Sequence, residues 1–125
     1  MTMRLGQILT LPDAALTEPL ALAVGLTGDD LFHFSGQLSE TRVEYLPLML
    51  IHAALARAPW AETVITPLVA EHFDAMDMAA ELALADYRGT YAVLVPPLPR
   101  PAIIRRELAA ICPGVHIELW TRAQH

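Results

Sequence analysis

The residues best suited to chemistry lie close together in the middle of the chain. Glu71, His72 and Asp74 precede an apolar-periodic stretch, and Asp77 and Glu81 fall on the same helix face as Asp74. One imidazole and two carboxylates form a ligand set that suits a divalent cation. The alternative interpretation is an acidic helix start, where the backbone dipole favours negative charge, followed by a solvated stripe. Because no second histidine stands at ligand spacing, the sequence assigns no metal site.

Further polar residues follow predicted strands, at the end where open parallel sheets bind their ligands. Ser35 and Gln37 follow one apolar run, and Thr66 lies near the end of the next. Together with the acidic segment, they form the candidate ligand-binding site.

Several classes of chemistry are excluded by composition. The chain contains no lysine, which removes Schiff-base and phosphate-loop lysines. Its one cysteine, Cys112, rules out an internal disulfide and a cysteine-based zinc site. No glycine-rich nucleotide motif and no serine-hydrolase motif occurs. The sequence therefore predicts no cofactor and favours a non-enzymatic protein.

Alternating strands and helices have to position these residues. Apolar runs predict strands at 31–35, 64–69, 91–95 and 115–120, and helical spacing predicts helices at 39–57, 74–86 and 101–111. This alternation predicts one α/β domain over residues 1–125, with a βα core at 31–120. Its mostly parallel sheet has four or five strands with helices on both faces, in a flavodoxin-like or receiver-like fold. The last run alternates, so we expect an edge strand with His116 and Glu118 on its wetter side.

Residues 1–30 allow two interpretations. Residues 3–9 could form a strand and 20–26 one side of a hairpin, which would place Asp29 and Asp30 in the turn before the next strand. Residues 13–24 could instead form a helix.

The predicted helix at 39–57 is apolar around most of its circumference, with a kink expected at Pro47. A second copy of the chain could cover its outer face, giving a homodimer with Met49, Leu50 and His52 in the interface. The alternative is that residues 1–30 fold over it.

A stiff proline-rich stretch follows the predicted strand at 91–95. Residues 96–106 include Pro97 and Arg100 and offer a second surface for a protein partner. From residue 98 onward four arginines and two glutamates give a net charge of +2, which leaves −8 for the rest of the chain. Such a basic end could dock an acidic partner.

Length and composition narrow the function further. The chain has 125 residues, of which 54% are hydrophobic, and a net charge of −6. The negative charge argues against nucleic acid, which needs a basic face. No apolar stretch approaches the ~20 residues that span a bilayer, and the start does not resemble a secretory signal. With a single cysteine, these features predict a cytoplasmic protein without a membrane partner.

The segment 64–97 resembles the middle of a response-regulator receiver domain. It runs from a strand to the helix start Phe73-Asp74-Ala75-Met76-Asp77, and then through Asp86-Tyr87-Arg88-Gly89 into the next strand. The resemblance implies a receiver-like fold.

This sequence departs from the receiver pattern at the residues that carry its activity. Thr66-Pro67 stands in place of the phosphate-accepting aspartate, and Pro96 in place of the hydroxyl residue. Thr121 lies near the position of the missing lysine, Ser35-Gly36 replaces the acidic pair, and one strand–helix unit is missing or moved. The resemblance therefore implies a module that cannot be phosphorylated at the usual place.

Together these observations favour a regulatory or protein-interaction module that self-associates. The alternative is a small-molecule or metal-binding α/β protein, with or without enzymatic activity, whose site lies at the carboxyl ends of the strands.

Overall fold

The computed structural model of the chain describes residues 19–122. The strand considered at 3–9 lies outside these residues. Eleven elements follow one another: β1 (Leu20–Val24), α2 (Gly28–Leu31), η1 (Phe32–Phe34), β2 (Arg42–Leu46), η2 (Leu48–Leu50), α3 (Ile51–Arg57), β3 (Thr63–Pro67), α4 (Ala75–Leu84), β4 (Thr90–Val95), α5 (Pro101–Ile111) and β5 (His116–Thr121).

The five strands form one parallel sheet in the order β2-β1-β3-β4-β5. This order is that of the flavodoxin-like doubly wound folds. The predicted fold class is confirmed.

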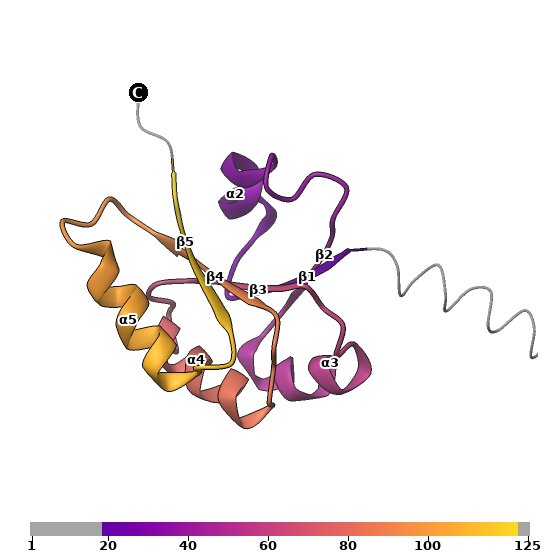
Figure 1. Cartoon of the computed structure of the whole chain (residues 1–125). Helices are drawn as coiled ribbons and strands as arrows, with labels where there is room; N and C mark the ends of the chain where they lie inside the picture. Colours follow the sequence, from indigo (N-terminus) through magenta and orange to yellow (C-terminus); the bar gives the residue numbers. More distant parts are fainter. Residues whose placement is uncertain (1–18, 123–125) are drawn as a thin grey trace, which may run out of the picture.

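Helices lie on both faces of the sheet, and the two faces differ in cover. Helices α3, α4 and α5 lie along one face, and the short α2 segment lies on the other (Figure 1). The larger core lies under the three helices and includes Leu22, Met78 and Tyr91. The core under α2 is smaller and rich in alanine, with Ala21, Ala23, Leu31, Ile65 and Ala92 buried in it.

The second half of the chain folds as its pattern predicts. Strands β3, β4 and β5 and helices α4 and α5 lie within a few residues of the predicted ranges. Asp74 caps α4 through a capping box with Asp77, and Pro101 begins α5, where its missing N–H is not needed. Strand β5 pairs with β4 at the end of the strand order, as an edge strand should.

The strand predicted at 31–35 is wrong, because these residues form helical turns. The hydroxyl of Thr27 accepts the Asp30 N–H, and the Asp30 carboxylate accepts the Thr27 N–H at 2.7 Å. This capping box starts α2, and η1 continues it. The first strand of the sheet is β1, so Asp29 and Asp30 follow its carboxyl end rather than preceding a strand.

The helix predicted at 39–57 is also wrong over its first half. Residues 42–46 form strand β2, in which Val43 and Tyr45 suit a strand and alternate with charged residues. Pro47 is extended, with φ −76° and ψ 159°, and helical turns begin only after it. The expected kink is therefore a strand-to-helix junction. No helix that is apolar all round exists at 39–57, so this feature no longer predicts a homodimer.

Candidate functional site

A hollow lies at the carboxyl ends of β1, β2 and β3, on the side of α3 and α4. We call it the carboxyl-end groove; its volume is about 690 Å³. The order of the strands reverses between β1 and β3, and doubly wound sheets bind ligands at such a switch point. The residues that line the groove are mostly apolar: Gly25, Pro47, Leu48, Met49, His52, Ala70, Glu71, His72, Phe73 and Glu81.

Gly25 shapes the groove where β1 ends. Its φ of +74° lies in the left-handed region, which glycine adopts without strain. A Cβ at this position would lie 2.9 Å from Cζ of Phe73, so the ring packs directly over the backbone. Any larger residue would have to move Phe73 and change the groove.

The mouth of the groove carries exposed apolar side chains. Pro47 ends β2 and directs the chain into η2, a short turn in which no residue is buried. Met49 is 84% exposed, and the next residue, Leu50, is 49% exposed. The apolar surface of the groove therefore continues out onto the molecular surface.

The polar groups of the groove form two histidine–carboxylate pairs. Nε2 of His52 lies 2.6 Å from Oε1 of Glu81, which joins the start of α3 to the middle of α4. Nε2 of His72 lies 3.9 Å from Oε1 of Glu71, and both side chains are almost fully exposed. The first pair is part of the wall, whereas the second stands at the rim.

Only some of the residues predicted as a ligand-binding site lie in the groove. Glu71 and His72 line the carboxyl-end groove. The Asp74 carboxylate accepts the Asp77 N–H at 2.9 Å, and the Asp77 carboxylate accepts the Asp74 N–H at 3.0 Å, so both hold the start of α4. In the described part of the chain, no three His, Cys, Asp or Glu side chains could jointly hold a metal ion.

Thr66 belongs to the core rather than to the groove. It is fully buried, and its hydroxyl lies 2.7 Å from that of Tyr91, which donates to the Ala75 carbonyl oxygen at 3.1 Å. Burial raises the pKa of Tyr91 well above its ordinary value, so the phenol stays neutral. These hydrogen bonds tie β3 and β4 to the start of α4.

Ser35 and Gln37 lie elsewhere, because the residues directly before them form helical turns and not the predicted strand. Both are exposed on the connection between η1 and β2 and do not line the carboxyl-end groove. Among the predicted interface residues, Met49 and His52 line the groove, whereas Pro97 and Arg100 are exposed in the connection after β4.

Sequence reasoning did not place Gly25 and Phe73 in the site. A glycine that directly follows an apolar run was the available signal, but it required residues 20–24 to be recognised as a central strand. A second hollow of about 320 Å³ lies at the carboxyl ends on the α2 side, with Asp29, His33 and Arg122 in its lining.

Comparison of the sequence with models of protein families finds no match, and comparison with curated proteins finds none either. Among the helices of residues 19–122, none combines the length and the apolar character needed to cross a bilayer.

Proposed function

We propose that this protein is a non-enzymatic regulatory module that binds an apolar segment of a partner protein in the carboxyl-end groove. The observation that carries this proposal is the exposure of Met49 at the mouth of an apolar hollow, with Leu50 beside it. A small ligand would be served by an enclosed pocket, whereas apolar surface that extends past the groove suits a protein segment. Methionine also adapts to partner side chains of different shape.

The charges around the groove define the chemistry of the partner. Glu71 and Glu81 lie in the lining, and the chain as a whole carries a net charge of −6. Among the described residues that line the groove there is no arginine, and the basic side chains are His52 and His72. The partner segment therefore carries a large apolar residue with a basic residue beside it.

The resemblance to receiver domains supports the regulatory part of the proposal. The strand order and the segment 64–97 both suit a receiver-like module. Thr66-Pro67 and Pro96 stand where the resemblance places a phosphate-accepting aspartate and a hydroxyl residue. In this proposal, partner binding at the groove takes the place of phosphorylation.

Self-association in the cytoplasm remains a second proposal. A second copy could cover Met49 and Leu50 as well as a different protein could, and the single cysteine suits a reducing compartment. Sedimentation that gives a monomer mass at micromolar concentration would exclude the homodimer.

The groove can be tested with a library of random twelve-residue peptides displayed on phage and selected on the full chain. We expect the enriched peptides to share a large apolar residue next to Arg or Lys. Met49→Asp places a charge at the mouth and should weaken their binding at least about tenfold, since a buried unpaired charge is costly.

Leu84→Asp is the matched control, because Leu84 is 77% exposed on α4 and does not line the groove. It should leave peptide binding unchanged. Enriched peptides that bind both variants as well as they bind the original chain would contradict the proposal. If no peptide is enriched but a small apolar compound raises the melting temperature only when Met49 is intact, the small-molecule alternative replaces it.

A further inference from the structure

Strand β5 has an open edge. It pairs with β4, and no other strand in residues 19–122 lies beside it. The N–H of His116 donates to the Gly89 carbonyl oxygen at 3.0 Å, so His116 directs its backbone groups towards β4. Backbone direction alternates along a strand, and Ile117, Leu119 and Thr121 therefore direct their N–H and C=O groups to the open side.

A groove runs along this open edge between β5 and α5. We call it the edge groove; it has a volume of about 540 Å³ and is lined by Arg105 and Ala109 of α5 and by residues 115–120. Ile117 and Leu119 pack into the core shared with α5. An extended segment laid along the edge would thus meet the backbone groups of the open side, with α5 beside it.

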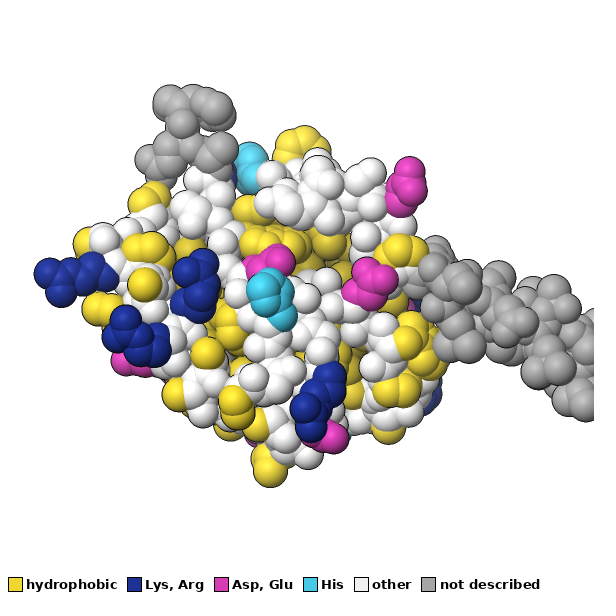
Figure 2. Space-filling model, in the orientation of Figure 1, with side chains coloured by type: hydrophobic (Ala, Val, Ile, Leu, Met, Phe, Trp, Pro, Cys, Tyr) yellow, Lys and Arg dark blue, Asp and Glu magenta, His cyan; other side chains and the backbone are white. Residues whose placement is uncertain are grey.

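The C-terminal part of the chain, which forms the edge groove, differs in net charge from the part before it. Residues from 98 onward carry +2, and the remainder carries −8. Arginine side chains gather over α5 on the left of Figure 2. Two copies that met at this edge would bring like charges together, whereas an acidic segment would be attracted.

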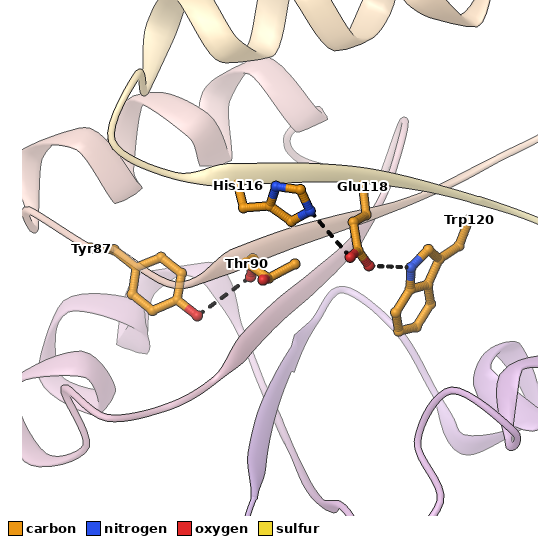
Figure 3. A network of polar contacts seen from close by, with 5 residues as sticks. All are labelled: Tyr87, Thr90, His116, Glu118 and Trp120. Atoms are coloured by element: carbon orange, nitrogen blue, oxygen red, sulfur yellow. Dashed lines mark hydrogen bonds and ion pairs between the residues drawn. The ribbon is translucent and has the colours of Figure 1, made fainter.

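The carboxylate of Glu118 is engaged on the other face of β5. Its oxygens lie 3.3 Å from Nε2 of His116 and 3.0 Å from Nε1 of Trp120, which donates (Figure 3). The Trp120 ring stacks on Phe34, with centroids 5.6 Å apart. Because side chains alternate along the strand, this row points away from α5, and Arg105 is the charged residue that α5 contributes to the lining of the edge groove.

We propose that the edge groove binds an extended, acidic segment of a partner protein, which adds a sixth strand to the sheet. The segment hydrogen-bonds to Ile117, Leu119 and Thr121, and every second side chain, apolar or acidic, faces Ala109 and Arg105. This mode of recognition takes affinity from the main chain and specificity from alternate side chains. The site is separate from the carboxyl-end groove and does not depend on it.

The test uses the whole 125-residue chain with Met49→Asp, so that the carboxyl-end groove does not contribute. Random ten-residue peptides are selected on it, and amide hydrogen exchange is measured with and without each enriched peptide. We expect alternating apolar and acidic sequences whose binding weakens as salt rises. They should slow exchange at Ile117, Leu119 and Thr121, the amides of the open edge.

Two variants and a control make the test specific. Thr121→Pro removes an N–H on the open side and leaves the bonds to β4, and Arg105→Glu reverses the charge; each should weaken binding about tenfold. Arg57→Glu, an exposed arginine of α3, should leave it unchanged. The absence of enriched peptides, or peptides that leave the edge amides unprotected, would overturn the proposal. If the edge amides become protected without peptide as the protein concentration rises, a second copy of the chain binds the edge. That result would overturn the proposal of an acidic partner.

Discussion

The polar residues at the carboxyl ends of the strands form two groups. Some form hydrogen bonds within the fold, and others line the carboxyl-end groove. Thr66 and Asp74 are residue types that often bind ligands, yet the side chains of both form hydrogen bonds within the fold. His52, Glu71 and His72 lie where a partner can reach them. Residue type and spacing predict both groups equally well, because sequence does not say whether a hydroxyl meets a buried phenol or solvent.

The buried hydroxyl pair gives a prediction about stability. Tyr91→Phe removes the hydrogen-bond partner of the buried Thr66 hydroxyl and one of the donors to the Ala75 carbonyl oxygen. We expect the free energy of unfolding, measured in urea, to fall by about 1–3 kcal/mol. Tyr45→Phe, at a tyrosine that is 48% exposed, is the matched control and should change it little. Equal effects of the two variants would contradict a structural role for the pair.

Two buried tyrosines should lower the stability of the protein at alkaline pH. Burial raises the pKa values of Tyr87 and Tyr91, while an unfolded chain ionises near the ordinary tyrosine value of about 10. Each phenol holds its proton more tightly when folded, so its contribution is complete below about pH 10 and is lost as the pH rises further. Unfolding free energies measured in urea between about pH 8 and pH 11 should decline, and more steeply than in the double variant Tyr87→Phe/Tyr91→Phe. If the free energy of unfolding declines equally in both proteins, titratable groups other than these tyrosines cause the loss of stability.

Among the elements, the second half of the chain was predictable and the first half was not. From residue 63 onward, helix and strand periods are separated by clear breaks such as Gly89 and Pro101, and each element packs against its neighbour in sequence. Strand β1 is short and alanine-rich, and its identity depends on β2 and β3 pairing on either side. Pro47 also separates two elements whose apolar residues run on without interruption, so a single helix was inferred. Met49 and His52, which line the groove, were still named from the sequence, because both are exposed whether residues 39–57 form one helix or two elements.

The capping box of α4 gives a prediction about an element. Asp74→Ala removes the acceptor for the Asp77 N–H and should lower the free energy of unfolding by about 0.5–2 kcal/mol. Glu107→Ala, at an exposed position within α5, is the control and should have almost no effect. Urea unfolding of the two variants measures both values. A loss at Asp74 no greater than at Glu107 would show that tertiary packing alone holds the start of α4.

At the scale of the whole molecule, the two grooves lie in parts of the chain with opposite net charge. The carboxyl-end groove lies in the acidic part of the chain, and the edge groove lies in the basic part that begins at residue 98. The sequence already indicated this division of charge, and the sheet order explains where each part lies. The groove itself depends on Gly25, Phe73 and His52 meeting from three distant segments, which no local pattern reports.

The most direct test of the account is amide NMR of the full chain titrated with a peptide selected on it. We predict that the largest shifts cluster at Gly25, Met49, His52 and Phe73, and that Met49→Asp abolishes them while Leu84→Asp preserves them. Shifts that instead cluster around Asp29 and Arg122, in the hollow on the α2 side, would contradict the carboxyl-end groove as the binding site.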